Sequence, residues 1–377
     1  MEKKRILFII THLELGGAQK NLLDLVKGLD PESYSLWVCA GDQGYLKKEF
    51  LKLSGLKLVF IPSLVRSINP VLDTIAFFKL LFFMKKNTFD LVHVHSPKAS
   101  ILGRWAAFFA GVPSIVYTVH GWPFHEFISP LSSNFYIFLE RMTALITEKI
   151  IVISRHDMDK ALAAKIAPKD KICLIHYGVD LERFSRVFEK RNNGAVDSKS
   201  IITVASLKPQ KGLSYFLKMA RSLLEESPGL RLIIAGDGPD RDKVTRQLGA
   251  LGLEGKVVLA GWVEDIAGLM AKSAVLVLSS LWEGLPLAVI EGAIAGVPMV
   301  VTDTGGLRDL VVDGENAMVV PPADEKALAG AVKAMLSDYD QWARKTRMHR
   351  KILRLSDWSK ETMAAKVEDL YRCVFTH

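Results

Sequence analysis

The fold class follows from one stretch of the back half, AVLVLSSLWEGLPLAVIEGAIAGVPMVVT (274–302). It begins and ends with short runs rich in Val, Leu and Met, which are typical of buried parallel strands. Between these runs, apolar residues recur with helical period over 287–294, after a loop that contains Glu283, Gly284 and Pro286. Strand, loop, helix and strand in this order predict a βαβ unit of an α/β protein.

The same alternation continues along the rest of the chain. Short apolar runs are separated by longer segments with helical periodicity. In the front half the expected strands are RILFII (5–10), SLWVCA (35–40), LKLVFI (56–61), DLVHVH (90–95), SIVYTV (114–119) and KIIVIS (149–154). In the back half they are SIITVAS (200–206), LRLIIAG (230–236), KVVLAG (256–261), AVLVLSS (274–280) and VPMVVT (297–302). The pattern predicts two doubly wound halves.

A polar segment separates the two halves. Residues 186–200, RVFEKRNNGAVDSKS, are charged and show no apolar period, so we expect a linker there. It divides an N-terminal domain, 1–185, from a C-terminal domain, 201–356. In 357–377 the apolar residues fall on one helical face, which predicts a final helix that packs back on the N-terminal domain.

The composition indicates a globular protein. Of 377 residues, 49% are hydrophobic and 24% are charged, which excludes a disordered or fibrous chain. Cys39, Cys173 and Cys373 are too far apart for a disulfide framework or a zinc cluster, so we expect a reducing, cytoplasmic compartment. Residues 105–125 lack charged side chains, but Gly and Pro interrupt them, so we expect no transmembrane helix.

The net charge of +8 lies mostly in the front half. Residues 1–185 hold 23 Lys and Arg against 17 Asp and Glu, compared with 26 against 24 in 186–377. Such a surplus favours nucleic acid, an anionic membrane surface or phosphorylated small molecules as partners. The basic residues accompany no helix-turn-helix, zinc-finger or aromatic RNA-binding pattern, so we expect no nucleic acid.

One front-half segment, VLDTIAFFKLLFFMKKN (71–87), is unusually apolar and ends in Lys85 and Lys86. Its phenylalanines are Phe77, Phe78, Phe82 and Phe83. The pattern fits a core helix that covers a sheet, and it also fits a helix at a membrane surface. Both interpretations stay open.

Two glutamates lie around the loop-to-helix junction of the opening stretch. Glu283 belongs to the Gly-rich loop and Glu291 to the helix behind it. Backbone N–H groups at such a helix start attract an anion, and the helix dipole adds to that attraction. A carboxylate accepts two hydroxyl donors, so two of them around a phosphate seat suit a sugar and a ribose. The alternative is that both are solvated surface charges and the glycines only turn the chain.

With this pair, EGLPLAVIE (283–291), the chain resembles the retaining glycosyltransferases of family 4. The resemblance covers nearly the whole chain and includes LELGGAQK (13–20), TVHGWPFHE (118–126) and VASLKPQKGL (204–213). It implies the GT-B architecture, in which two Rossmann-like domains face each other across a cleft. The first would bind the acceptor and the second the nucleotide sugar. The tract 95–141 looks most like bacterial surface-polysaccharide members, whose acceptor is linked to polyprenyl diphosphate.

The resemblance also implies roles for residues at the expected strand ends. The implied catalytic residues are His120, Lys211 and Glu283. The implied substrate-binding residues are Gly16, Gly17, Ser206, Gly236, Gly238, Trp262, Gly284, Leu285, Pro286, Leu287 and Glu291. His95 could line the acceptor side, whereas we expect His93 to pack and Ser154 to cap a helix. Without the resemblance, a lone histidine or a Gly-Gly pair is often only structural.

Three positions depart from the family pattern. Ser206 stands where the family usually has an Arg that binds the donor diphosphate, Gln19 where it often has Glu, and Tyr177 where it usually has Asn. Lys208 or Arg308 could compensate for the missing Arg, although no spacing places either one.

We expect no metal and no cofactor, with the nucleotide sugar as a substrate. Glycosyl transfer needs a divalent ion or fixed protein donors to stabilise the departing diphosphate. The sequence has no Asp-x-Asp motif at a strand end. Lys211, the amides of 284–287 and the Gly305–Gly306 loop would serve instead.

The sequence thus predicts a metal-independent, retaining hexosyltransferase of bacterial surface polysaccharide biosynthesis. It would move a hexose or N-acetylhexosamine from a nucleotide sugar, with UDP the expected nucleotide, to a glycan or polyprenyl-diphosphate-linked acceptor. We expect it in the cytoplasm, with the inner face of the cell membrane as a candidate site of attachment. Two alternatives stay open: a nucleotide-sugar epimerase of the same fold, and a catalytically silent scaffold, which Ser206 in place of Arg keeps in view.

Overall fold

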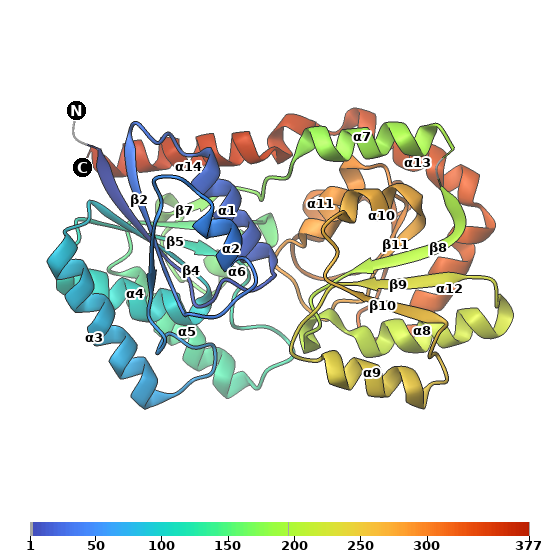
Figure 1. Cartoon of the computed structure of the whole chain (residues 1–377), viewed down its shortest axis with the longest axis horizontal. Coiled ribbons are helices and arrows are strands. Elements are labelled where there is room, and N and C mark those ends of the chain that lie inside the picture. The colour runs from blue at the N-terminus through green and yellow to red at the C-terminus, as the bar shows by residue number, and fades with distance from the viewer. Residues whose placement is uncertain (1–2, 195, 377) are drawn as a thin grey trace. The chain divides into compact units, whose positions relative to one another are not determined.

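The computed structural model describes residues 3–194 and 196–376. They form two compact units (Figure 1). Unit 1 runs to Gly178 and resumes at Lys360, and unit 2 is Val179–Ser359. Each unit has a parallel sheet with helices on both faces, which confirms the predicted α/β class.

In the described residues, unit 1 has a seven-stranded sheet of order β3-β2-β1-β4-β5-β6-β7. Its strands are β1 (Lys4–Ile9), β2 (Tyr34–Ala40), β3 (Lys57–Phe60), β4 (Leu91–His95), β5 (Ser114–Val119), β6 (Lys149–Val152) and β7 (Ile172–Leu174). Its helices are α1 (Gly17–Gly28), α2 (Lys47–Leu51), α3 (Pro70–Asn87), α4 (Pro97–Ala110), α5 (Pro130–Ala144), α6 (Arg155–Ala163) and α14 (Lys360–Phe375). Helices α1 and α14 cover one face of this sheet, and α3, α4 and α5 cover the other (Figure 1).

Unit 2 has a six-stranded sheet of order β10-β9-β8-β11-β12-β13, again counted over the described ranges. Its strands are β8 (Asp197–Val204), β9 (Arg231–Ala235), β10 (Val257–Gly261), β11 (Ser273–Leu278), β12 (Met299–Thr302) and β13 (Ala317–Val320). Its helices are α7 (Leu181–Asn192), α8 (Leu213–Glu226), α9 (Arg241–Ala250), α10 (Ile266–Lys272), α11 (Leu287–Ile294), α12 (Glu325–Ser337) and α13 (Tyr339–Ile352). The short strands β7 and β13 have no counterpart among the expected ones.

The expected linker at 186–200 is instead the end of α7 and the start of β8. The buried stripe of α7 starts at Phe184 and continues through Val187, Phe188 and Arg191, so it begins ahead of the polar window and escapes notice there. The chain passes between the units at Gly178–Val179 and Ser359–Lys360. Of the predicted ranges, residues 1, 2, 195 and 377 lie outside the described residues.

The core-helix interpretation of 71–87 is confirmed for one side of α3, and the membrane-surface interpretation stays a prediction. Helix α3 buries Ala76, Leu80 and Met84 against the sheet, whereas Phe78 and Phe82 are exposed. No helix within 3–194 or 196–376 has the length and apolar character that a membrane crossing requires.

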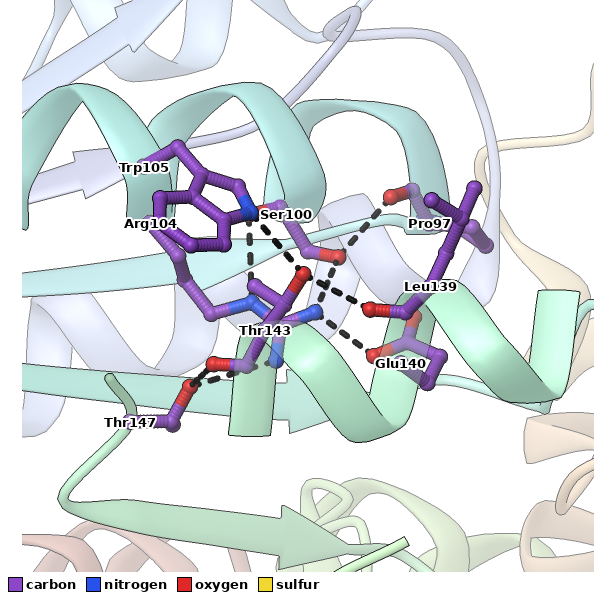
Figure 2. Close-up of polar contacts among 8 residues, drawn as sticks. All are labelled: Pro97, Ser100, Arg104, Trp105, Leu139, Glu140, Thr143 and Thr147. Atoms are coloured by element: carbon purple, nitrogen blue, oxygen red, sulfur yellow. Dashed lines mark hydrogen bonds and ion pairs between the residues drawn. The ribbon is translucent and has the colours of Figure 1, made fainter. Parts of the chain in front are cut away.

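A buried ion pair joins α4 to α5 in unit 1 (Figure 2). Nη2 of Arg104 lies 2.6 Å from a carboxylate oxygen of Glu140, and the two side chains are 0% and 2% exposed. The guanidinium also donates to the backbone oxygen and hydroxyl of Ser100 and to the hydroxyl of Thr147, and it lies 4.2 Å from the ring centroid of Tyr117. These four hydrogen bonds and the charge of Glu140 offset the cost of removing the guanidinium from water.

Candidate functional site

The polar residues of unit 2 gather where β8 and β11 end. These strands are neighbours, and the strand order reverses between them, since β9 follows β8 on one side and β12 follows β11 on the other. Ligands of open α/β sheets bind at such a point, beyond the carboxyl ends of the strands. Two hydrogen bonds join the following loops: the Leu281 amide donates to the Gln210 oxygen at 2.8 Å, and the Ser279 hydroxyl to the Lys211 oxygen at 2.9 Å.

The structure brings together two of the predicted catalytic residues, Lys211 and Glu283. The Lys211 ammonium lies 2.5 Å from Oε1 of Glu283, and the two side chains are 15% and 6% exposed. The Ser280 hydroxyl donates to the same oxygen at 2.7 Å, and the Gln210 amide donates to Oε2 at 3.1 Å. Three donors therefore fix the carboxylate, while the ammonium keeps further donor capacity for an anion.

Two glycines allow the loops to approach this closely. Gly212 has φ of 56°, and a Cβ there would lie 2.1 Å from the backbone oxygen of Ser279. Gly305 has φ of 61°, and its Cβ would lie 2.1 Å from the backbone oxygen of Glu283. Any side chain at either position would push apart the segments that hold Lys211 and Glu283.

The predicted substrate glycines Gly236 and Gly238 follow β9, and both have a clear packing role. A Cβ at Gly236 would lie 2.0 Å from the Ala205 oxygen, and one at Gly238 would lie 2.6 Å from the Leu207 oxygen. They let the loop after β9 pack on the loop after β8. Whether they also approach a nucleotide stays a prediction.

The remaining predicted residues of unit 2 follow strands of the same sheet or lie in α11. Gly284, Leu285 and Pro286 are buried, Leu287 begins α11, and Glu291 lies in that helix with 4% of its surface exposed. Ser206 is half-buried just beyond β8, and Trp262 is exposed just beyond β10. Arg308, one candidate to replace the family's Arg, forms two hydrogen bonds with Asp303 at 3.1 and 2.7 Å.

In unit 1, Gly16 and Gly17 lie where β1 leads into α1. Gly16 is the N-cap with φ of −165°, an extended conformation open to any residue. A Cβ at Gly16 would meet the Gln19 side chain at 2.5 Å, and Gln19 itself donates to the His12 oxygen at 3.2 Å. The conformation therefore does not demand glycine at position 16, so its predicted contact with substrate rests on the resemblance.

His120 follows β5, is half-buried and lies in a row with the buried histidines His93 and His95. Its Nε2 lies 2.9 Å from Nδ1 of His95, and its Nδ1 lies 2.6 Å from the hydroxyl of Tyr177. The rings of His95 and His120 stack with centroids 5.1 Å apart. Next to them, His93 bonds the hydroxyls of Tyr371 and Thr118 at 2.5 and 2.7 Å.

These histidines are neutral at pH 7. Burial lowers the pKa of His93 to about 3 and also lowers the pKa of His95 and His120. A neutral imidazole carries one N–H, so one ring donates and the other accepts between His95 and His120. His120 thus presents a neutral ring whose two nitrogens are both engaged within unit 1.

His95 does not line a surface, contrary to our expectation. Its side chain is fully buried because its ring lies between those of His93 and His120. His93 packs as predicted, and Ser154 caps α6 by accepting from the Asp157 amide at 3.1 Å.

Sequence reasoning missed Gln210, Ser280 and the partnership of Tyr177 with His120. Gln210 is adjacent to Lys211, and Ser280 precedes Glu283 by three positions, so both were near residues already singled out. The contact between Tyr177 and His120 joins segments 57 positions apart, which no local pattern reveals.

Comparison with known proteins shows the family of this chain. The Glycosyltransferase Family 4 profile matches residues 15–183, and the Glycosyl transferases group 1 profile matches 185–351. A galactosyltransferase of Escherichia coli, the UDP-Gal:alpha-D-GlcNAc-diphosphoundecaprenol alpha-1,3-galactosyltransferase, is 30% identical over 87% of this chain and 88% of its own. The chain belongs to glycosyltransferase family 4. Another relative, the putative glycosyltransferase EpsD of Bacillus subtilis, is 29% identical over 66% of the family 4 chain described here and 67% of its own.

Solved structures place this family 4 protein in the GT-B fold. Anabaena HepE in complex with UDP and glucose has a TM-score of 0.78 at 20% identity, covering 97% of this chain and 99% of that one. Sucrose-phosphate synthase from Thermosynechococcus elongatus has a TM-score of 0.80 at 19% identity, covering 99% and 100%. The predicted family and architecture are confirmed.

Proposed function

We propose that this glycosyltransferase moves a hexose or N-acetylhexosamine from a UDP-sugar to a polyprenyl-diphosphate-linked glycan, with retention of anomeric configuration and without a metal. The Lys211–Glu283 pair at the junction of β8 and β11 carries the proposal. It sets a cation for the diphosphate beside a carboxylate for sugar hydroxyls. The Escherichia coli relative uses UDP-Gal and a diphosphoundecaprenol-linked acceptor, which supports both the nucleotide and the acceptor class.

Each proposed contact follows from the chemistry of the group. Lys211 would turn from Glu283 toward the diphosphate, and Glu283, still held by Ser280 and Gln210, would accept from the sugar. Glu291 would accept the ribose hydroxyls, and Trp262, Gly236 and Gly238 would lie near the nucleotide.

The proposed sugar transfer needs no protein nucleophile. The acceptor hydroxyl oxygen bonds to the anomeric carbon on the face that the diphosphate leaves, and the bond between that carbon and the diphosphate oxygen breaks. A phosphate oxygen takes the hydroxyl proton. Lys211 and the backbone amides of 284–287 and 305–306 would stabilise the charge that develops on the diphosphate.

The test is protection against thermal unfolding by uridine, UDP, GDP, ADP and UDP-sugars, with and without chelator. A ligand at one hundred times its dissociation constant adds about 2.7 kcal/mol. We expect chelator-insensitive protection by UDP and by one UDP-sugar. Lys211→Met should weaken protection by UDP but not by uridine, because uridine has no diphosphate, whereas Glu291→Gln should weaken both.

Lys218→Met is the matched control, because Lys218 is exposed on α8 and pairs with the half-buried Glu325. Its protection profile should equal that of the wild type. Lack of protection by every nucleotide would support the silent scaffold that Ser206 keeps in view. Conversion of a UDP-sugar to its epimer without acceptor would support the epimerase, and an inverted product would contradict retention.

A further inference from the structure

Helix α5 exposes an unbroken apolar stripe. Four residues of α5, Leu131, Phe135, Phe138 and Met142, and its C-cap residue Leu145 follow one another at intervals of four, three, four and three residues, and all are exposed. Residues at these intervals share one side of a helix. The inner side of the same helix buries Glu140, Thr143 and Ala144, so the exposed residues do not contribute to the core.

Helix α3 carries a second stripe of the same kind. Val71, Ile75, Phe78 and Phe82 are spaced by four, three and four residues and are exposed, with 64% of Phe82 accessible. The rings of Phe78 and Phe82 stack with centroids 6.2 Å apart. Single exposed apolar residues are ordinary on a protein surface, but two such rows are not.

Helix α4 packs against both α3 and α5. Phe77 lies 5.3 Å from Phe78 and 6.3 Å from Phe109 of α4, measured between ring centroids. Phe109 lies 5.9 Å from Trp105, whose indole N–H donates to the Thr143 hydroxyl on α5 at 3.1 Å (Figure 2). Helix α4 itself exposes Phe108 and Phe109. We call the exposed apolar side chains of these three neighbouring helices the aromatic face.

The unpaired charges of these three helices are all positive. Their two acidic residues are both paired, Asp73 with Lys98 and Glu140 with Arg104. The remaining charged side chains are basic and exposed: Lys79, Lys85, Lys86 and Arg141. The aromatic face thus combines apolar rows with four cations and no acid left to balance them.

We infer that the aromatic face docks unit 1 on an anionic membrane surface, where Phe and Leu side chains enter the acyl boundary and the four cations contact lipid phosphates. The inference rests on the proposed function, in which the acceptor is linked to a lipid, and it adds which surface of unit 1 meets the membrane and which lipid charge it needs. A second copy of the chain is a poor occupant, because a symmetric contact would set these cations against one another.

The experiment is cosedimentation of the full chain with vesicles of neutral phosphatidylcholine and with vesicles that contain 30% phosphatidylglycerol. We expect binding to the anionic vesicles that weakens with salt. Lys85→Gln with Lys86→Gln should weaken it about fivefold for each charge removed. Phe82→Ser with Phe135→Ser should abolish it, with the charge unchanged.

The matched control is Met348→Ser with Ile352→Ser, because both residues are exposed on α13 of unit 2. It should bind as the wild type does. Equal binding to both vesicle types, or equal binding by the Phe82/Phe135 variant, would overturn the inference. Self-association that only this variant abolishes, without vesicle binding, would assign the face to a second copy. Protection by UDP reports on the donor site independently. A protein that binds UDP but no vesicle would therefore contradict the docking surface and leave the proposed function standing.

Discussion

The Arg104–Glu140 pair of unit 1 and the Lys211–Glu283 pair of unit 2 have similar lengths and different surroundings. Their closest N–O distances are 2.6 and 2.5 Å. The first pair lies between two helices, and Ser100, Thr147 and the ring of Tyr117 occupy the rest of the guanidinium (Figure 2). The second lies in loops at strand ends, and its ammonium has donor capacity left over.

The difference separates a pair that stabilises from a pair that can exchange partners. A fork-shaped guanidinium with four of its five N–H donors engaged holds one geometry, and its removal leaves the carboxylate of Glu140 buried without a cation. A lysine is a compact charge on a flexible stem and can move from one anion to another. Distance alone does not distinguish these roles, whereas the location and the remaining partners do.

The largest expected effect is on stability, from Arg104→Met. Because the variant leaves Glu140 buried without its cation, we expect the free energy of unfolding to fall by about 3–5 kcal/mol. Equilibrium unfolding in urea, followed by circular dichroism, measures the change.

The double variant Arg104→Met with Glu140→Leu is the control. It removes both charges and should recover most of the lost stability. If the double variant is no more stable than the single one, then the ion pair is not what holds α4 to α5.

Lys211→Met should show the opposite profile, with a large loss of activity and little loss of stability. Removing one preorganised group that stabilises developing charge costs about 10²–10³ in rate. Glu283 keeps the Ser280 and Gln210 donors, so we expect the free energy of unfolding to change by only about 1 kcal/mol. The kcat of sugar transfer and urea unfolding, measured on the same preparation, give both numbers. A variant that transfers at the wild-type rate would remove Lys211 from the site.

The sequence alone predicts the strands well because both sheets are parallel and buried. The runs 274–280 and 114–119 are mostly apolar and carry no charge, and they overlap β11 and β5. Helix α7 was missed because its outward side is charged and its buried stripe straddles the expected boundary. The very short strands β7 and β13 carry too few residues to stand out.

The sequence predicts site residues best where the polar residues and the loop-to-helix junction that holds them lie in one short segment, as in EGLPLAVIE (283–291). What the sequence does not contain is which side chain meets which. Lys211 and Glu283 are 72 positions apart, and only the alignment of β8 beside β11 brings them together. The same limit applies to His95, whose place near a strand end suggested an exposed ring until its stacked neighbours were known.

The histidine row gives a smaller effect that extends the comparison to buried groups without a counter-charge. Burial lowers the pKa of His93 to about 3, below the ordinary value of 6.5 that the unfolded chain would show. Below pH 6.5 the unfolded chain therefore binds protons that the folded chain does not. The stabilisation is complete above pH 6.5 and is lost as the pH falls toward 3, by about 1.4 kcal/mol per pH unit for each such histidine.

Unfolding free energies at pH 7, 6 and 5 measure this slope. His93→Gln keeps a polar group toward Tyr371 and Thr118 but cannot titrate. Its unfolding free energy should therefore change less with pH than that of the wild type, by about 1.4 kcal/mol per pH unit. His156→Gln is the matched control, because His156 is exposed on α6, and its slope should be unchanged. Equal slopes in all three proteins would mean that His93 takes up its proton while folded. The buried imidazolium of His93 would then have no carboxylate partner, unlike the guanidinium of Arg104. The structure would no longer separate buried groups that are charged and paired from buried groups that are neutral.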